Sequence, residues 1–297
     1  MTAHAPATLR PNGPAPARPR SVPSPGRLLG NVGKASLLVV ALVLTLGPVI
    51  WTVSTSFRTP AESFTLPPQL FPASPTIDAY TQVFASIDFW MLVYNSVLVT
   101  ALITASQMFS AAFAGYVFAR YPSRGMSAAF ALVLVTLMVP IQVTIIPVFM
   151  IVRGMGLSDT LLALIIPAIP TAFGTFLMRQ HFRSVPAELG EAAMVDGAGP
   201  WRTFFSVYLP LGWPAMAIVG VLAFNSHWNE FFRPLVLELS EKNFTLPLGL
   251  VTLQGNLGTG SVSVVLAGVV LAALPAIIVF LFGQRALRSG LTSGAIK

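Results

Sequence analysis

The sequence has no cysteine and few charged residues. The absence of cysteine from the 297 residues excludes a disulfide framework, a thiolate zinc site and a thiol nucleophile. Only 9% of the residues are charged, against about 25% in an ordinary soluble domain. Hydrophobic residues make up 55% of the chain, and the mean hydropathy is +0.77. This balance argues against a soluble enzyme, a nucleic-acid-binding protein and a disordered protein, and it favours a protein surrounded largely by lipid.

Motifs for nucleotide, metal or acyl-transfer chemistry are also missing from the sequence. It contains no G-x-x-x-x-G-K-[ST] phosphate-binding loop. The three histidines, His4, His181 and His227, have no metal-ligand spacing, and no Ser/His/Asp grouping can be argued. A lone histidine at a membrane boundary is most often a solvated or hydrogen-bonded structural residue. The sequence therefore predicts no catalytic residue, no metal site, no cofactor and no enzymatic activity.

The chain contains several long apolar segments. The first, residues 35–57, would span about 34 Å as a helix, which is enough to cross a hydrocarbon core of about 30 Å. Prolines lie inside several segments, and membrane helices tolerate them where neighbouring helices satisfy the freed carbonyls. We expect an all-α integral membrane protein with six transmembrane helices, at about residues 35–57, 89–119, 126–151, 160–180, 206–227 and 262–284.

The first 33 residues differ in composition from the rest. They contain seven prolines and four arginines, which predicts a disordered tail. A signal peptide is the alternative, but the apolar segment that follows is longer than the roughly 7–15 residues of a signal sequence. We divide the chain into this tail (1–33), the first transmembrane helix with an external loop (34–88), a core of five transmembrane helices (89–284) and a C-terminal tail (285–297).

The distribution of positive charge predicts the orientation in the membrane. If the N-terminus lies inside, 13 of the 17 Lys and Arg residues fall on the inner side and four on the outer side. Because inner loops are enriched in these residues, we expect both termini to be cytoplasmic in a multi-pass protein of a prokaryotic inner (plasma) membrane. The net charge of +7 is thus an orientation signal and not a nucleic-acid footprint.

The connection between the fourth and fifth segments, residues 183–205, is long and polar. Pro186 suits the first turn of a helix and Pro200 the first turn of another, while Gly197 and Gly199 permit a sharp turn between them. Carboxylates that complement a helix N-terminus and good helix formers fill the first half: Glu188, Glu191, Ala192, Ala193 and Met194. We expect a helix–turn–helix on the cytoplasmic side, exposing small residues and carboxylates that suit docking into a cleft on a protein partner.

This loop resembles the EAA loop of ABC importer permeases. The matching pattern is Glu191-Ala192-Ala193, three residues, Gly197, nine residues, Val207, one residue and Leu209-Pro210, with valine where isoleucine is usual. The likeness covers residues 35–297 and is to the MalG-type inner-membrane subunit of carbohydrate ABC importers. Further matching stretches are Tyr94–Ser96, Ala114–Arg120, Pro140–Gln142, Ile146–Pro147, Gly156–Leu157, Asn225–Glu230 and Gln284–Lys297.

The resemblance implies a type I ABC importer permease fold and a coupling helix that sits in a groove of the ATPase subunit. Because the sequence has no phosphate-binding loop, ATP must be bound by a separate chain. Carried over residue by residue, the ATPase-coupling surface is Glu191, Ala192, Ala193, Asp196 and Gly197. A family tail that also touches the ATPase corresponds to a stretch containing Gly290, Leu291, Gly294 and Lys297. The alternatives are a short helix that only caps the bundle, and a frayed terminus.

Neutral polar residues in the spans are candidates for a substrate path. Amide side chains can donate and accept hydrogen bonds to sugar hydroxyls, and Asn95, Gln142 and Asn225 lie within apolar segments. The same amides can instead hold helices together. The spans have few ionisable residues near their centres, which argues against a proton relay because a central charge costs about 2.5–3.5 kcal/mol.

Together these observations predict a permease subunit of an ATP-driven, binding-protein-dependent importer of a sugar or oligosaccharide. Its expected partners are a second homologous permease, a dimer of ATP-binding subunits, an extracytoplasmic solute-binding protein, the carbohydrate and membrane lipid, but no nucleic acid. Related permeases carry other solutes such as glycerol phosphate or polyamines, and this remains the alternative within the class. A secondary transporter would need intramembrane charges and repeated halves, and a membrane scaffold would not explain the long polar loop.

Overall fold

The computed structural model describes residues 25–59, 70–255 and 260–293, and in these ranges it contains helices and no strand. The chain divides into two compact parts, residues 1–50 and residues 51–297, which are described separately. The helices in chain order are α1 (Pro25–Ser56), α2 (Asp78–Ser86), α3 (Phe89–Arg120), α4 (Arg124–Thr136), α5 (Ile141–Gly154), α6 (Leu161–Ile165), η2 (Ile166–Ala168), α7 (Ala172–Ser184), α8 (Glu188–Val195), α9 (Pro200–Thr203), η3 (Phe204–Tyr208), α10 (Leu209–Trp228), α11 (Phe232–Leu237), η4 (Glu241–Asn243), α12 (Leu246–Val251), η5 (Thr252–Gln254) and α13 (Val262–Ser293).

Helix α1 carries the first expected span. It begins at Pro25, earlier than the boundary expected at residue 34, so residues 25–33 are helical. Residues 1–24 of the expected tail lie outside the described residues. The large apolar side chains of α1 are exposed, among them Leu37, Leu44 and Ile50. A helix that is apolar on every face belongs in lipid or inside a larger assembly, which agrees with a membrane span.

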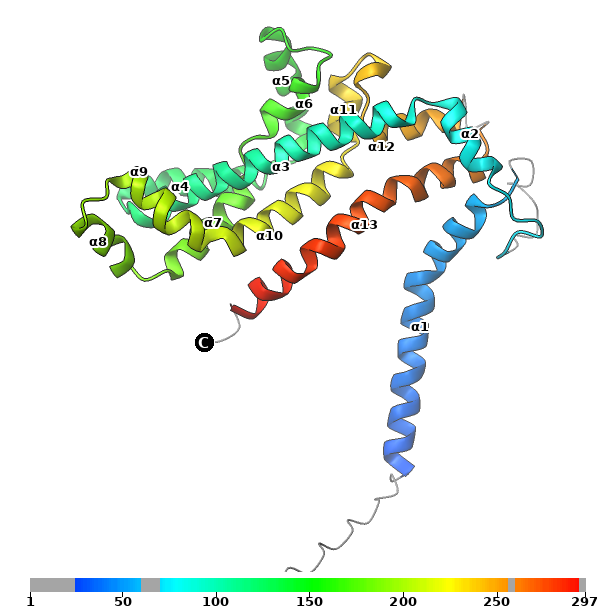
Figure 1. The fold of residues 1–297 in the computed structure, drawn as a ribbon, viewed down its shortest axis with the longest axis horizontal. Coiled ribbons are helices and arrows are strands. Elements are labelled where there is room, and N and C mark those ends of the chain that lie inside the picture. The colour runs from blue at the N-terminus through cyan, green and yellow to red at the C-terminus, as the bar shows by residue number, and fades with distance from the viewer. Residues whose placement is uncertain (1–24, 60–69, 256–259, 294–297) are drawn as a thin grey trace, which may run out of the picture. The chain divides into compact units, whose positions relative to one another are not determined.

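Helices α3, α7, α10 and α13 form the body of the second part. Helix α3 packs along α7 and α10, and α10 packs along α13 (Figure 1). The α3–α7–α10 contact buries apolar side chains next to small ones, including Ala111, Ala112, Met178 and Val219. Small residues allow membrane helices to approach closely, where dispersion forces replace the hydrophobic effect as the source of stability. Because α3 contacts both neighbours, it is the central helix of this part.

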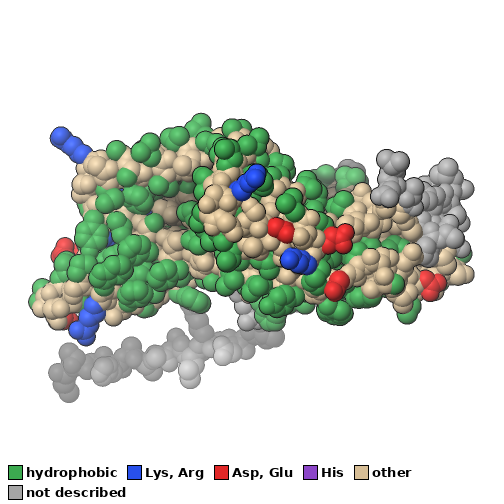
Figure 2. Space-filling view, turned by 90° about the horizontal axis from the view of Figure 1, so that it is seen from above, with side chains coloured by type: hydrophobic (Ala, Val, Ile, Leu, Met, Phe, Trp, Pro, Cys, Tyr) green, Lys and Arg blue, Asp and Glu red, His purple; other side chains and the backbone are tan. Residues whose placement is uncertain are grey.

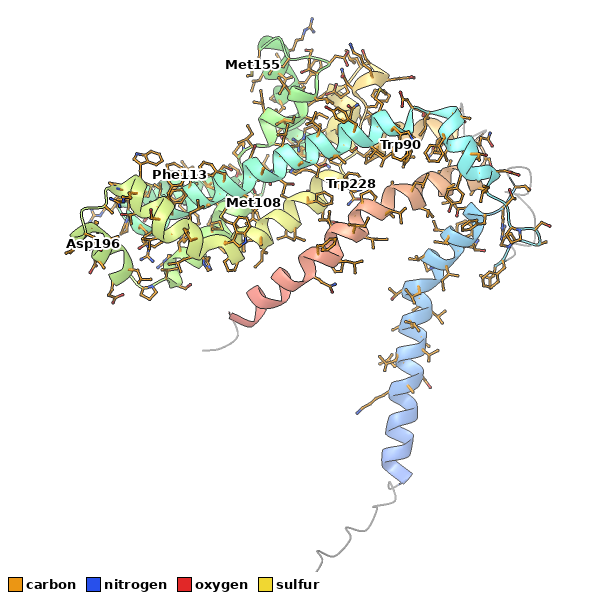
Figure 3. All side chains as sticks on the ribbon, viewed as in Figure 1. Trp90, Met108, Phe113, Met155, Asp196 and Trp228 are labelled. Atoms are coloured by element: carbon orange, nitrogen blue, oxygen red, sulfur yellow. The ribbon has the colours of Figure 1, made fainter. Side chains whose placement is uncertain are left out.

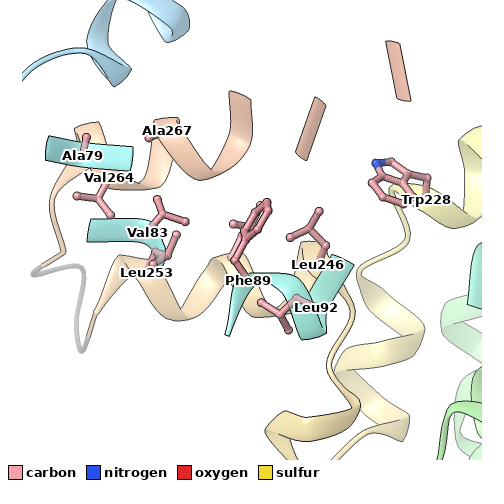
Figure 4. Packing of buried hydrophobic residues seen from close by; sticks show 10 residues of the cluster. Ala79, Val83, Phe89, Leu92, Trp228, Leu246, Leu253, Val264 and Ala267 are labelled. Atoms are coloured by element: carbon pink, nitrogen blue, oxygen red, sulfur yellow. The ribbon is translucent and has the colours of Figure 1, made fainter. Parts of the chain in front are cut away.

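A second core lies where α2, α12 and α13 meet the N-terminal end of α3 (Figure 4). Val83 from α2 and Leu246 from α12 are fully buried there, beside Phe89 of α3. Trp228, at the end of α10, donates its indole N–H to the carbonyl oxygen of Ala272 at 3.1 Å. The external loop expected over residues 58–88 therefore contains a packed helix, α2.

The third expected span, residues 126–151, is not one straight helix. Helices α4 and α5 meet at an angle of 104° across a break of four residues. Pro140 is the N-cap of α5, with an extended backbone. Proline disfavours helical geometry in the residue before it and cannot donate to a preceding carbonyl, so α4 does not continue through this point. Among the described residues, five other helical stretches are long and apolar enough to cross a membrane, and the bent pair makes a sixth if it counts as one span.

The fourth expected span is broken by Pro167 and Pro170, and α3 satisfies the carbonyls at the break. Gln107 donates to the carbonyl oxygen of Ala168 at 2.7 Å, and Ser110 donates to that of Ile169 at 2.9 Å. An unpaired carbonyl inside a membrane would cost several kcal/mol. Side chains of α3 therefore satisfy two carbonyls at this interruption of the span.

The surface of the molecule is rich in apolar side chains. Figure 2 shows one face on which hydrophobic side chains are widespread and charged side chains are few. Large apolar residues on the spans are strongly exposed, for example Trp213, Ile146 and Phe282. Soluble proteins rarely expose an apolar surface of this extent to water. The fold is therefore that of a multi-pass membrane protein.

Candidate functional site

The expected coupling loop forms α8 and α9 at one end of the second part (Figure 1). We call this the α8 end. It is also where α3 finishes at Arg120, and Asp196 is labelled there in Figure 3. Residues Glu188–Val195 are helical, with Glu188 and Glu191 in the first turn, where carboxylates interact favourably with the helix dipole. Pro186 does not occupy the first helical position as expected, because α8 begins at Glu188 after Ala187 as N-cap.

The turn that follows α8 depends on Gly197. Its φ is +77°, a backbone conformation that glycine adopts without strain. The amide of Ala198 donates to the carbonyl oxygen of Ala193 at 2.9 Å, and the amide of Gly197 donates to that of Met194 at 3.0 Å. These two hydrogen bonds define a Schellman motif. Pro200 then begins α9 with Gly199 as N-cap, so the expected helix–turn–helix is present.

The five coupling candidates lie together on α8 and its C-terminal turn. Glu191, Ala192, Asp196 and Gly197 are exposed, and Ala193 is half-buried. Beside them Met194 and Val195 are 61% and 88% exposed, which adds an apolar tip that the sequence analysis did not single out. The exposed face of α8 therefore carries carboxylates next to apolar side chains.

Tyr208 packs beneath α8 and joins it to the end of α3. The hydroxyl of Tyr208 lies so close to Gly190 that a Cβ on that residue would come within 2.5 Å of it. The guanidinium of Arg120 lies over the Tyr208 ring, 4.7 Å from its centroid. Arg120 also donates to the carbonyl oxygens of Phe182 and Val185, which are otherwise orphaned at the end of α7. A displacement of α8 would therefore reach α3, α7 and the π-helical turn η3 through direct contacts.

The C-terminal candidates are only partly within the structure. Gly290 and Leu291 fall in the last turns of α13, which continues to Ser293. Gly294 and Lys297 lie outside the described residues. The segment expected to be a tail from residue 285 is thus helical as far as Ser293.

The three substrate-path candidates lie on different helices, and within the described ranges no hydrogen bond joins any two of them. Asn95, on α3, is buried and donates to the carbonyl oxygens of Lys242 and Phe244 at 2.8 and 3.0 Å. Both of its amide protons are thereby used, which matches the helix-holding alternative. Gln142 on α5 and Asn225 on α10 are exposed. The backbone and side-chain oxygens of Asn225 face Asn229, at 2.8 and 3.5 Å from its amide nitrogen.

A polar network that sequence reasoning missed lies at the opposite end of α10. The amide nitrogen of Gln107 donates to Ala168 and lies 3.1 Å from Nε2 of His227. Because an amide N–H must donate, Nε2 accepts, and the other ring nitrogen carries the proton. That nitrogen, Nδ1, lies 2.8 Å from a carboxylate oxygen of Glu230. The sequence did contain a signal for this network. His227, Glu230 and Arg233 are spaced three residues apart, and this spacing brings side chains together around a helix end.

Arg233 completes this network. Its Nε and Nη2 donate to the two carboxylate oxygens of Glu230 at 2.9 and 2.8 Å, and its Nη1 donates to the carbonyl oxygen of Leu164 at 2.9 Å. Burial alone would raise the pKa of Glu230, but the hydrogen bond from His227 and the positive charge of Arg233 outweigh it, so the pKa lies below its ordinary value. The network ties α3, α6, α10 and α11 together at this end.

Asp159 holds the loop after α11 in place through hydrogen bonds. It is a non-glycine residue with φ of +55°, and its carboxylate accepts hydrogen bonds from the amides of Leu239 and Ser240 at 3.0 and 2.8 Å. The hydroxyl of Ser240 also donates to it. These bonds, led by that from the Ser240 side chain, hold the pKa of Asp159 well below its usual range. The connections after α5 and after α11 are therefore joined by one carboxylate.

Glu238, next to this clamp, is a buried carboxyl group. It is 3% exposed, and neither of its carboxyl oxygens has a hydrogen-bond partner among the described residues. Burial, with a smaller contribution from the charge of Asp159, raises the pKa of Glu238 to about 8. The carboxyl group of Glu238 therefore keeps its proton to a higher pH than an ordinary glutamate does.

Replacing Glu238 with glutamine, which cannot ionise, is expected to stabilise the protein relative to wild type by about 2–3 kcal/mol more at pH 9 than at pH 6, because one pKa unit corresponds to about 1.4 kcal/mol. The native carboxyl keeps a proton that the unfolded chain loses between pH 4.5 and about 8, so wild-type stability falls as pH rises through this window. The thermal unfolding midpoint in a neutral detergent at pH 6 and pH 9 measures the effect. Glu241→Gln is the matched control, and identical pH dependence in wild type and Glu238→Gln would contradict the assignment.

The chain matches a known family over most of its length. Residues 111–293 match the family described as "Binding-protein-dependent transport system inner membrane component". The chain is 35% identical over 227 residues to the arabinooligosaccharides transport system permease protein AraQ of Halalkalibacterium halodurans, covering 76% of this chain and 81% of the relative. It is 31% identical over 275 residues to the lactose transport system permease protein LacG of Rhizobium radiobacter, covering 91% and 98%.

A solved structure has the same fold. A chain of a bacterial ABC transporter involved in the import of the acidic polysaccharide alginate aligns with a TM-score of 0.78 and 26% sequence identity. The alignment covers 89% of this chain and 99% of that one. The fold resemblance therefore extends well beyond the segment matched by the family.

Proposed function

This chain belongs to the family of inner-membrane components of binding-protein-dependent transport systems, and from that premise we propose that it is the permease subunit of an ATP-driven importer of a carbohydrate. The observation that carries the proposal is the α8 end: within the family-matched residues, an exposed helix with Glu191 in its first turn is presented on a glycine turn. Relatives named as permeases for arabinooligosaccharides and lactose support a sugar or oligosaccharide as the substrate.

In the proposed mechanism, a displacement of α8 is passed to the spans through the contacts of Tyr208 and Arg120. A separate ATPase dimer binds ATP, and its closure pushes on Glu191, Ala192, Ala193, Asp196 and Gly197. The α8 end transmits the displacement to α3 and α7 through Tyr208 and Arg120, and the spans tilt to give alternating access. The tail that includes Gly290, Leu291, Gly294 and Lys297 is proposed as a second ATPase contact. With α8 cytoplasmic, both termini are cytoplasmic and the α11 loop faces outward, toward the solute-binding protein.

A second permease subunit completes the proposed pathway. Gln142 and Asn225 are exposed on the isolated chain, and an amide facing lipid tails would lose its hydrogen bonds to water. Their faces therefore suit a water-filled path or the partner permease. Asn95 belongs to the path only through its remaining carbonyl oxygen, because its amide protons are taken. A phosphorylated or polyamine solute is the alternative cargo.

The test is reconstitution of the chain with a second permease, an ATPase and a solute-binding protein from the same organism. The binding protein is first screened against oligosaccharides of arabinose, galactose and glucose by thermal shift. We expect ATP hydrolysis in vesicles to rise with the sugar-loaded binding protein, and uptake of that sugar to require ATP. The Glu191→Lys variant is expected to insert normally and to abolish the stimulation. Sugar-independent hydrolysis, or normal uptake by Glu191→Lys, would contradict the proposal.

A further inference from the structure

Two adjoining cavities lie at the α8 end, and their chemistries differ. The first, of about 320 Å³, lies beneath α8 and includes Arg120 and Tyr208 in its lining. The second, also of about 320 Å³, is lined by apolar and aromatic side chains that include Phe113, Val117 and Phe204. Tyr116 and Tyr121 line both cavities. The pair therefore offers a charged compartment next to an apolar one.

Arg120 supplies the positive charge of the first cavity. Its Nη2 donates to the carbonyl oxygens of Phe182 and Val185, and its Nε is buried. Its Nη1 makes no hydrogen bond to the described residues and is the nitrogen left to contact a molecule in the cavity. Glu191 lines the same cavity, yet within the described ranges no carboxylate is close enough to form an ion pair with Arg120. An unpaired, partly buried guanidinium with a free donor favours an anion, and phosphate oxygens match its geometry well.

The wall of the second cavity is aromatic and open to the surface. The rings of Phe113 and Trp201 stack in parallel, with centroids 5.2 Å apart and planes 6° apart. Trp201 is nevertheless 63% exposed, and Figure 3 labels Phe113 near α9 at this end of the fold. Exposed tryptophan on an apolar surface is typical of the membrane–water interface, where one side of the ring meets acyl chains.

The position of the cavities along the spans agrees with that interface. The apolar span of α3 ends at Arg120, and the span that leads into α10 begins at Pro200. Both residues line the first cavity, so it lies where two spans leave the hydrocarbon. Basic pockets between helices at this depth attract lipid headgroups, at about 1 kcal/mol per basic residue.

We infer that the two cavities together bind one anionic phospholipid, with its phosphate at Arg120 and an acyl chain against the Phe113–Trp201 wall. Arg120 complements the negative phosphate, and the adjoining apolar cavity suits an acyl chain. A sugar has no acyl chain to fill the apolar cavity, so the two cavities together favour the phospholipid. The inference needs only that the chain spans a membrane, so it stands apart from the proposed cargo and from the proposed direction of transport.

The experiment is fluorescence quenching by brominated lipids. The full chain is reconstituted in phosphatidylcholine vesicles that contain brominated phosphatidylglycerol or, at equal mole fraction, brominated phosphatidylcholine. The contribution of Trp201 is isolated by subtracting the signal of a Trp201→Phe variant. We expect the phosphatidylglycerol to reach half-maximal quenching at about a fivefold lower mole fraction, and this preference to shrink as salt is raised.

Matched variants decide whether the site is specific. Arg120→Gln is expected to remove the fivefold preference, whereas Arg124→Gln, at an exposed arginine that lines neither cavity, is expected to retain it. If Arg120→Gln fails to fold, Val117→Phe replaces it, because filling the apolar cavity is expected to reduce quenching of Trp201 by both lipids. Equal quenching by the two lipids, no quenching by either, or an equal loss of preference in Arg124→Gln would each overturn the inference.

Discussion

A Gly197→Val variant is expected to insert and assemble normally but to retain roughly a tenth or less of the substrate-stimulated ATP hydrolysis of the reconstituted transporter. Gly197 has φ of +77°, and a Cβ placed on it would meet nothing within 4 Å. Valine would therefore act through backbone strain alone, which costs about 1–2 kcal/mol in the left-handed region and more for a β-branched residue. Relaxation of the turn would move Asp196 and the end of α8 away from a docked partner.

Gly199 offers a matched control for this prediction. It lies two residues further on, and a Cβ there would also meet nothing within 4 Å. Its φ is −70° with ψ of 170°, an extended conformation that valine adopts readily and that suits the residue before a proline. Gly199→Val is therefore expected to keep most of the stimulated hydrolysis. If both variants hydrolyse ATP like wild type, the glycine turn does not position the coupling surface.

The Glu230→Ala variant is expected to lower the free energy of unfolding by about 3–5 kcal/mol, the usual cost of removing one partner of a buried ion pair. The side chain of Arg233 is 9% exposed and that of Glu230 is 18% exposed, so the remaining guanidinium would stay largely dehydrated. His227 would lose its acceptor as well. The thermal unfolding midpoint of the purified chain in a neutral detergent measures the change.

Controls separate the pair from general effects of charge. Glu241→Ala removes an exposed carboxylate and is expected to change stability by less than about 0.5 kcal/mol. Adding Arg233→Met to Glu230→Ala is expected to recover part of the loss, because the uncompensated charge is then gone. The pKa of Glu230 lies below its ordinary value in the folded state, so the contribution of the pair is present at neutral pH and is lost as pH falls through that lowered pKa. Full additivity in the double variant would contradict a direct interaction.

The sequence was most informative where local chemistry decides the structure. Gly197 and Pro200 predicted the turn and the start of α9, because glycine adopts the left-handed backbone without strain and proline suits the first turn of a helix. Apolar length likewise predicted that the chain crosses a membrane several times. The same reasoning misplaced the start of α8, since Pro186 is compatible with more than one position before a helix.

Features that depend on distant residues could not be predicted in this way. The prolines inside the segment 126–151 indicate an interrupted helix, but neither they nor hydropathy gives the angle of 104° between α4 and α5. The partner of His227 is Gln107, which is 120 positions away in the sequence. The buried state of Glu238 follows from packing between α5, α6 and α11, and an isolated glutamate in a polar loop gives no indication of it.

The hydrogen bonds from α3 to the broken segment before α7 also bear on how the chain is built. Gln107 and Ser110 are synthesised about 60 residues before the carbonyls of Ala168 and Ile169 that they satisfy. Because a carbonyl without a partner in the hydrocarbon costs several kcal/mol, we expect the earlier helix to supply these donors as the later segment inserts. The donors are thus synthesised before the acceptors that they satisfy. In a circular permutant with α3 last, the segment before α7 would be synthesised before its donors.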